Sequence, residues 1–361
     1  TKGIWLGPLK DLGHRRFCNI TWTGNPVKCL GIYLGHNKQK CEYLNWDKKI
    51  HKIKSEISVW KRRHLTLEGK ILIVKTMLLS KIVFPASMLV VPEHIVKDLK
   101  KMIFQYLWNG KDKIKRKVLI NTKENGGYNM TDIDSFLDAL KATWICRLLS
   151  LHGKWKYILL HYLHRMDLSL LLVLRMNFRS ITHFPELGKI PLFYQQILTC
   201  FNKTKDIKPI SVLNDHELLQ EPLFGNENLM CNDKCLFFKN WIKSGIYCVK
   251  HLISEDGNIL SDEELYNRIT TKQNVLSEMY ILKKLLSKWL SRCNLKLAPH
   301  IFDKNEVRIL HKNKYFIMVD QNCKFFYQIL LNKSHERSYM EEICTGINRL
   351  HVRQCDVFTC V

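Results

Sequence analysis

Apolar side chains recur at helical spacing in three consecutive stretches of the chain, residues 46–63, 66–85 and 92–108. The repeating apolar positions are Ile50, Ile53, Ile57 and Trp60, then a run from Ile71 to Ile82, then Ile95, Leu99, Met102, Ile103 and Tyr106. Positions three or four residues apart share one face of a helix. The pattern therefore predicts three amphipathic helices with short connections, which together form a compact bundle.

Three residues mark the expected ends of these helices. Thr66 is suited to cap the second helix, because its hydroxyl can accept a hydrogen bond from a backbone N–H of the first turn. Pro85 is expected to end that helix, since proline has no backbone N–H and clashes with the preceding turn. Pro92 is expected in the first turn of the third helix, where the missing N–H costs nothing.

The segment before the bundle has a different pattern. Glycine and proline interrupt residues 1–27, which favours loops and short strands. A strand is expected over residues 27–34, with Gly31 inside it. This glycine has two interpretations: part of a hairpin that another backbone approaches closely, or a bulge in an ordinary edge strand. Further helical stretches follow the bundle, so the expected fold is mainly α with a short N-terminal β hairpin. We divide the chain into residues 1–40, 41–110, 111–210 and 211–361.

The charge balance narrows the possible partners. The 361-residue chain has 57 Lys and Arg against 33 Asp and Glu, a formal net charge of +24. This excess favours nucleic acid or an anionic membrane surface, although a merely basic soluble protein has the same composition. The most apolar run, Leu168–Leu174, is far shorter than the roughly 20 residues that span a bilayer, so no membrane association is expected. The 13 cysteines show no disulfide framework, which indicates reduced thiols in the nucleus or cytoplasm.

Basic side chains are concentrated on the bundle and just after it. Lys61, Arg62 and Arg63 end the first predicted helix, and Lys70 and Lys75 lie on the second. Residues 109–117 form a basic loop that includes Lys113, Lys115 and Arg116. Two interpretations of this loop remain: an ordinary solvated loop, or a clamp for phosphate groups.

Several short motifs in this order are typical of one protein family. They are Lys28–Gly35, Asn45–Trp46, Trp60–Arg63, Leu67–Ile71, Ser80–Lys81, Val91–Pro92, Phe104–Trp108 and Gly126–Gly127, with weaker matches at Trp241–Ile246 and Phe325–Leu330. With these motifs, residues 26–150 resemble the end of the palm and the thumb of a LINE-type (non-LTR) retrotransposon reverse transcriptase. The resemblance is specific because many motifs occur in the right order.

The resemblance implies a function and a set of contacts. Residues 1–40 would be the end of the palm, residues 41–110 the thumb, and residues 111–210 and 211–361 the post-thumb and C-terminal regions. Truncation of the last region is an open alternative. The chain would bind RNA and DNA, as template RNA and primer in an RNA–DNA hybrid, with no small-molecule substrate. The residues expected at nucleic acid are Lys28, Leu30, Gly31, Lys61, Arg62, Arg63, Lys70, Lys75, Lys113, Lys115 and Arg116.

The polymerase chemistry itself is not expected in this chain. An RNA-directed DNA polymerase holds two metal ions with carboxylates, including an Asp-Asp pair, and the sequence contains no Asp-Asp dipeptide. In the family that pair precedes the palm hairpin, so we expect it upstream of Thr1, together with the endonuclease. Magnesium is accordingly expected only with that catalytic palm, and no cofactor is expected here. Asp132 and Asp134 are interpreted as a helix cap and a surface residue.

Two groups of cysteine and histidine residues have the ligand types of zinc sites. The first consists of Cys231, Cys235, Cys248 and His251, for which structural thiols are the favoured interpretation. The second consists of Cys344, His351, Cys355 and Cys360, whose order differs from the Cys-Cys-His-Cys knuckle of some LINE-type proteins. Zinc is therefore an open alternative at both groups, and no metal ligand is assigned.

Two functions of different classes follow from the sequence. The first is a reverse transcriptase fragment that binds template and primer through a basic thumb. The alternative is a catalytically inert, degenerate or repurposed fragment that acts as a nucleic-acid-binding or interaction module. The missing catalytic carboxylates favour the alternative, and the ordered family motifs favour the first.

Overall fold

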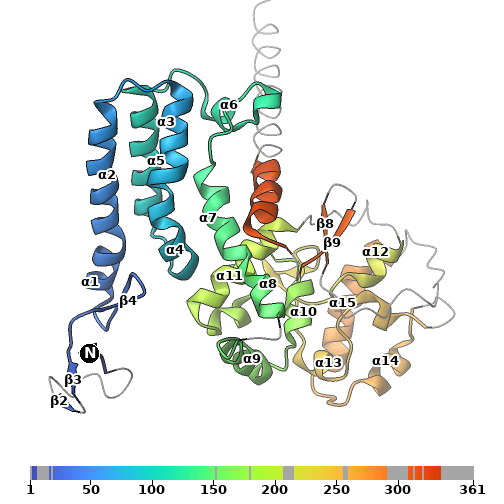
Figure 1. Ribbon diagram of the computed structural model, residues 1–361. Helices are drawn as coiled ribbons and strands as arrows, with labels where there is room; N and C mark the ends of the chain where they lie inside the picture. The colour runs from blue at the N-terminus through green and yellow to red at the C-terminus, as the bar shows by residue number, and fades with distance from the viewer. Residues whose placement is uncertain are drawn as a thin grey trace, which may run out of the picture. The chain divides into compact units, whose positions relative to one another are not determined.

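The computed structural model describes residues 2–5, 16–17, 19–150, 153–178, 180–205, 215–254, 259–290, 308–311, 314–318 and 321–334. The structure is 62% helix and 8% strand, which confirms the predicted mainly α fold. The chain divides into two compact units. The first unit is Thr1–Leu140 with Lys333–Val361, and the second is Lys141–Asn332. Figure 1 shows the elements of each unit.

The predicted N-terminal hairpin consists of two short antiparallel strands, β4 (Val27–Cys29) and β5 (Ile32–Leu34). Leu30 and Gly31 form its two-residue turn, with φ angles of 49° and 87°. Positive φ at both central residues matches the twist of paired strands. The chain reverses direction at this turn, so the hairpin interpretation of residues 27–34 is confirmed and the edge strand with a glycine bulge is wrong.

A small sheet precedes the hairpin in the first unit. Its central strand β3 (Ile20–Trp22) pairs in parallel with β1 (Lys2–Gly3) and antiparallel with β2 (Arg16–Phe17). The indole rings of Trp5 and Trp22 stack with their centroids 3.9 Å apart. The glycine-rich segment thus forms short strands, as its composition predicts.

The bundle has the three predicted helical stretches. They comprise α1 (Lys38–Glu42), a π-helical turn Tyr43–Asp47, α2 (Lys48–Lys61), α3 (Leu67–Ile73), a second π-helical turn Val74–Leu78, α4 (Ser80–Met88) and α5 (Glu93–Trp108). The predicted apolar faces form its core: Ile53, Ile57, Ile71, Val74, Leu78, Ile82, Ile95, Leu99, Ile103 and Tyr106 are buried. Ile50 and Trp60 are half-buried at the margin. Burial of these faces, rather than helix propensity, stabilises helices of this length.

One of the three predicted helix ends is confirmed, and the other two differ from the prediction. The Thr66 hydroxyl accepts a hydrogen bond from the Gly69 backbone N–H at 3.2 Å, so Thr66 caps α3 as predicted. Pro92 takes the capping position itself, one residue before α5 begins. The prediction that Pro85 ends its helix is wrong, because α4 continues through it to Met88. Pro85 is buried, so its packing in the core offsets the hydrogen bond that its ring removes.

A short connection leads from the bundle to the last helices of the first unit. It contains α6 (Arg116–Ile120) and a 3-10 turn Lys123–Asn125, and it is followed by α7 (Ile133–Ala142). The predicted basic loop therefore ends at Lys115, because Arg116 already begins α6. The carboxylate of Asp132 accepts from the Ser135 backbone N–H at 3.0 Å, which confirms the predicted helix cap. Asp134 is an exposed residue on α7 that pairs with Lys100.

The second unit is also mainly helical. Its helices are α8 (Trp144–Leu149), α9 (Lys156–Arg165), α10 (Leu170–Arg175), α11 (Leu192–Thr204), α12 (Asp215–Gln220), α13 (Lys239–Lys243), α14 (Asp262–Arg268), α15 (Val275–Leu290) and a last helix at residues 323–334. Two hairpins, β6–β7 (Met230–Cys231 and Lys234–Cys235) and β8–β9 (Arg308–His311 and Lys314–Ile317), complete it. Trp241 and Phe224 are fully buried in its core.

Candidate nucleic-acid interface

The hairpin, the bundle and the start of α6 carry a strong excess of positive charge. Residues 26–120 contain 21 Lys and Arg against seven Asp and Glu. Most of the predicted contact residues are exposed to solvent: Lys28, Leu30, Lys61, Arg62, Arg63, Lys113, Lys115 and Arg116. Lys70, Lys75 and Gly31 are half-buried. The predicted set is thus largely accessible, although its members occupy several separate places on the first unit.

One group of lysines is assembled from two elements that the sequence separates by about 20 residues. Lys28 lies on β4, and Lys49 and Lys52 lie on α2. Partial burial lowers the pKa of the Lys49 ammonium, and the neighbouring charges of Lys28 and Lys52 lower it further. None of the three is in an ion pair with a carboxylate among the residues that the structure describes. We call these three residues the hairpin–helix cluster.

A buried asparagine brings the hairpin to the helix. The Asn45 side chain accepts a hydrogen bond from the Tyr33 backbone N–H and donates one to the Tyr33 carbonyl, both at 2.8 Å. Asn45 therefore pairs with the open edge of β5 as a neighbouring strand would. Only 3% of Asn45 is exposed, and the adjacent Trp46 is buried as well. This anchor fixes the position of Lys28 relative to α2.

The turn of the hairpin presents an apolar side chain to solvent. Leu30 is 86% exposed and has a left-handed backbone conformation that non-glycine residues rarely adopt. No atom lies within 4 Å of the position that a Cβ would take on Gly31, so this side of the turn is open. The Leu30 side chain is therefore accessible to another molecule at the tip of the hairpin.

The end of α2 forms a second basic group. Lys61, Arg62 and Arg63 are consecutive and exposed. The Arg63 guanidinium lies 4.9 Å from the ring centroid of Trp60, which orients it by a cation–π contact. The half-buried Trp60 ring therefore contacts Arg63 as well as the bundle.

Two of the predicted contact residues are half-buried, and one of them, Lys70, has a structural role. The Lys70 ammonium donates a hydrogen bond to the Leu107 carbonyl at 3.1 Å and lies 5.9 Å from the Tyr106 ring centroid, so it stabilises the C-terminal end of α5. Burial lowers the pKa of Lys75, and the charge of Lys123 lowers it further. Both lysines are thus less accessible than the sequence predicts, because their helix turns them partly toward the rest of the unit.

The basic loop brings Lys113, Lys115 and Arg116 to the end of α5. The Arg116 guanidinium lies 4.1 Å from the ring centroid of Phe104, and its Nε donates a hydrogen bond to the Asp112 carboxylate at 2.7 Å. Arg116 is therefore held in one orientation, whereas Lys113 is an exposed loop residue. Arg116 also lines a surface groove with residues of α5.

The first predicted cysteine–histidine group is divided between two elements of the second unit. Cys231 and Cys235 lie on the β6–β7 hairpin. The Cys248 sulfur lies 3.3 Å from Nδ1 of His251. Among the described residues, no three His, Cys, Asp or Glu side chains gather in a group suited to a metal ion. The second predicted group, Cys344, His351, Cys355 and Cys360, lies outside the described residues.

Burial sets the chemistry of the Cys248–His251 pair. It raises the pKa of the Cys248 thiol to about 12 and lowers the pKa of the His251 imidazole to about 4. Both groups are therefore neutral near pH 7, and a thiol that remains protonated is a poor nucleophile.

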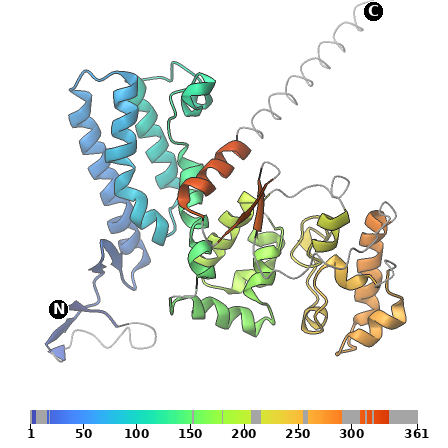
Figure 2. The same cartoon turned by 45° about the vertical axis from the view of Figure 1, so that its right-hand side comes forward.

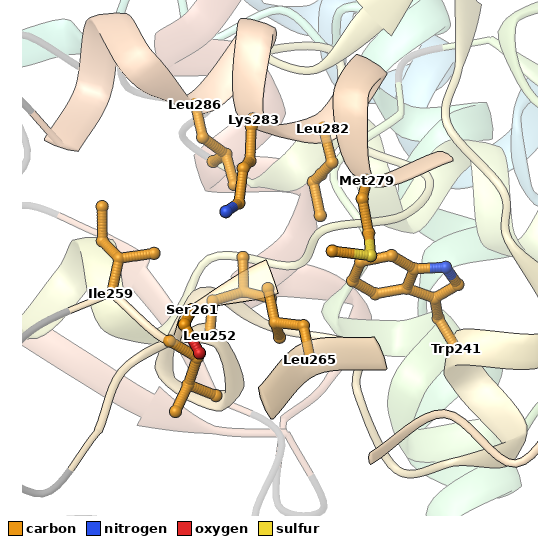
Figure 3. Close-up of a pocket in the computed structure, with 10 residues that line it drawn as sticks. Trp241, Leu252, Ile259, Ser261, Leu265, Met279, Leu282, Lys283 and Leu286 are labelled. Atoms are coloured by element: carbon orange, nitrogen blue, oxygen red, sulfur yellow. The ribbon is translucent and has the colours of Figure 1, made fainter. Parts of the chain in front are cut away.

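The second unit also contains an apolar pocket of about 530 Å³ (Figure 3). Trp241, Leu252, Leu265, Met279 and Leu286 contribute to its lining, with Lys283 and Ser261 as its polar members. Lys283 forms an ion pair with Asp262 on α14. Such a lining suits an apolar group and offers few donors for phosphate.

Comparison of the chain with protein-family models finds no match. Among the described helices, no single one has the length and apolarity needed to cross a membrane, although the pair Leu67–Leu78 and Ser80–Met88 passes that test jointly with a bend of 44°.

Asn45, Lys49 and Lys52 are the residues of this site that sequence reasoning did not assign. Asn45 belongs to one of the family-like motifs, and the two lysines lie three residues apart on the exposed side of a predicted helix. This motif and this spacing were the signals in the sequence that could have pointed to the three residues. The approach of Lys49 and Lys52 to Lys28 depends on the tertiary contact between Asn45 and Tyr33, which no local sequence pattern encodes.

Proposed function

We propose that the chain binds an RNA–DNA hybrid through the basic surface of its first unit, as the thumb and post-thumb region of a LINE-type reverse transcriptase. In this proposal the chain holds template RNA and primer, while a catalytic palm supplies the carboxylates and magnesium for polymerisation. The ordered family-like motifs of residues 26–150 support the family, and the geometry of the hairpin–helix cluster supports the binding.

The hairpin–helix cluster carries the proposal. Three ammonium groups are gathered without a carboxylate partner among the described residues, and the pKa of Lys49 is lowered first by partial burial and then by the charges of Lys28 and Lys52. A phosphate backbone would relieve the repulsion between these charges and release its own counterions. The exposed Leu30 lies at the tip of the same hairpin, where it is available for an apolar contact with a base or sugar.

Binding to a labelled RNA–DNA hybrid hairpin, measured by fluorescence anisotropy between 50 and 200 mM salt, tests the proposal. Double-stranded DNA and heparin serve as competitors. We expect a preference for the hybrid and a linear fall of log K with log salt, whose slope reports the number of phosphate contacts. Equal and weak affinity for all three polyanions would overturn the proposal.

The double variant Lys28→Gln/Lys52→Gln locates the binding surface. Removal of two phosphate contacts is expected to reduce the salt slope by about 2 and the affinity at low salt by roughly 10-fold or more. The matched control is Lys154→Gln/Lys234→Gln, which removes two exposed lysines of the second unit and produces the same change in net charge. Equal effects of the two double variants would show that only the total charge matters.

The second candidate is a catalytically inert, nucleic-acid-binding or interaction module that functions without a polymerase. The absence of an Asp-Asp dipeptide from the sequence favours it. The two candidates differ in one measurement: addition of a purified palm domain of a LINE-type enzyme would support primer extension only if the chain acts as a thumb. Hybrid binding without stimulated extension would favour the module.

A further inference from the structure

A separate basic groove of about 490 Å³ lies along α5 and the start of α6. Its cations are Lys97, Lys100 and Lys101 of α5, Lys111 of the loop, and Arg116. Both views show α6 and the β4–β5 hairpin at opposite ends of the bundle (Figures 1 and 2). The groove is therefore distinct from the hairpin–helix cluster.

The cations of the groove differ in their partners. Lys100 forms an ion pair with Asp134, and Lys97 lies 3.9 Å from the exposed carboxylate of Glu93. Lys101 and Lys111 are exposed and have no carboxylate partner among the described residues. These two lysines are thus available to an anion that enters the groove.

Arg116 adds a flat and oriented surface to this groove. One face of its guanidinium lies over the buried Phe104 ring, and Asp112 fixes its Nε. About half of the Arg116 side chain is exposed, and it lines the groove, so its other face is open to a ligand. A guanidinium plane that is already stacked on an aromatic ring is a platform for an unpaired base.

We propose that this groove binds a single-stranded RNA segment, with one base stacked on Arg116 and the adjacent phosphates at Lys101 and Lys111. The proposal rests on the proposed nucleic-acid-binding function and extends it to a second strand. A duplex keeps its base faces covered by neighbouring bases, so only an unpaired segment uses this platform. The amide of Gln105, which also lines the groove, offers a donor and an acceptor to the base edge.

An acidic peptide is the competing ligand for such a groove. Its carboxylates would pair with Lys101 and Lys111, but they would leave the open face of Arg116 without a partner. Asp112 already occupies the Nε donor of that guanidinium. The combination of a planar platform with flanking phosphate-binding cations therefore favours RNA.

The test uses the full chain and a labelled 12-nucleotide oligouridine, with the RNA–DNA hybrid hairpin measured in parallel. For Lys101→Gln/Lys111→Gln we expect at least a 5-fold loss of oligouridine affinity and less than a 2-fold change for the hybrid. Lys28→Gln/Lys52→Gln is the matched control, with the opposite pattern. Equal losses for both ligands in both variants would overturn the proposal.

Arg116→Lys tests the stacking contact, because it keeps the charge and removes the plane. We expect at least a 5-fold loss for oligouridine and no loss for an abasic oligonucleotide of equal length. The same loss on the abasic strand would refute base stacking. Effective competition by polyglutamate at equal charge would refute the RNA assignment.

Two features of the design separate this proposal from the proposed function. If the wild-type chain binds the hybrid but the groove variants bind oligouridine normally, only the groove assignment fails. If the wild-type chain binds neither ligand, the nucleic-acid function fails as a whole. The exposed pair Lys101 and Lys111 keeps the groove testable even where Arg116→Lys disturbs packing on Phe104.

Discussion

Lys49 in the first unit and Lys205 in the second unit both have a lowered pKa, but their surroundings differ. In the hairpin–helix cluster, Lys49 lies beside Lys28 and Lys52, and no carboxylate among the described residues pairs with them. In the second unit, burial lowers the pKa of Lys205 to about 7, while the charge of Glu221 acts in the opposite direction. A lowered pKa alone therefore does not identify a binding surface.

The difference lies in what surrounds each ammonium group. The Lys205 ammonium donates to the Met176 carbonyl and lies 5.0 Å from the Phe201 ring centroid. Glu221 also accepts hydrogen bonds from Asn177 and Asn226. The polar groups around Lys205 thus bond to one another inside the second unit, whereas the lysines of the hairpin–helix cluster have no carboxylate partner among the described residues.

The largest expected effect is the loss of stability that follows removal of the Lys205 ammonium group. Lys205→Met should lower the free energy of unfolding of the second unit by about 3 kcal/mol, because the Met176 carbonyl loses its donor and Glu221 loses a nearby positive charge. Lys52→Met, on the exposed face of α2, should change stability by less than about 0.5 kcal/mol. Urea denaturation of both variants compares them, and similar small losses would contradict the contrast.

The anchor of the hairpin–helix cluster is the next test. Asn45→Ala should cost about 2–3 kcal/mol in the first unit, because it leaves the N–H and carbonyl of Tyr33 without their partner in a buried place. The affinity for the RNA–DNA hybrid should also fall, because Lys28 is no longer held in its position relative to α2. Asn37→Ala removes only an exposed cap of α1 and should cost about 1 kcal/mol. An Asn45 variant with normal stability and affinity would refute the anchor.

A smaller effect is expected from pH. The folded pKa of His251 is about 4, because of burial and the charges of Lys250, Arg268 and Arg175. The unfolded state binds more protons than the folded state between pH 6.5 and pH 4, so stability should fall as the pH drops through this window. Because part of the ring is accessible, we expect a loss of about 1–2 kcal/mol.

His251→Asn sharpens this test. Nδ1 of His251 accepts hydrogen bonds from the backbone N–H groups of Tyr247 and Cys248 at 3.2 and 3.3 Å. The asparagine oxygen can take the place of that acceptor and does not titrate. Thermal unfolding followed from pH 7 to pH 4 should therefore show a flatter profile for the variant, and an unchanged profile would assign the acid sensitivity to other groups.

The smallest effect concerns the hairpin turn. Leu30→Gly should raise the stability of the first unit by about 1 kcal/mol, because glycine adopts a positive φ without the penalty of a side chain. Hybrid affinity should decrease at the same time, since the exposed apolar contact is lost. Leu30→Asn, which also tolerates this conformation, is the matched control and should behave similarly. Greater stability with undiminished binding would leave Leu30 without a role in recognition.

The local elements of the first unit were largely predictable. The spacing of Ile53, Ile57, Leu99 and Ile103 predicted the buried helix faces, and Thr66 predicted a helix cap. These features were predictable because they depend on contacts within a few residues. The continuation of α4 through Pro85 was not predictable in this way. It depends on how the core packs around a buried proline ring.

By itself, the sequence determined a mainly α fold, three amphipathic helices, a glycine-containing strand segment before them and a strongly basic first unit. Only the tertiary structure decided which cations meet. Asn45 joins the hairpin to α2 and brings Lys28 beside Lys49, Lys70 turns inward to the end of α5, and Arg116 stacks on Phe104 to form one wall of a groove. The spacing of apolar residues along the sequence indicates which side of a helix is apolar. The partner of a polar side chain, in contrast, is set by contacts between residues far apart in the chain.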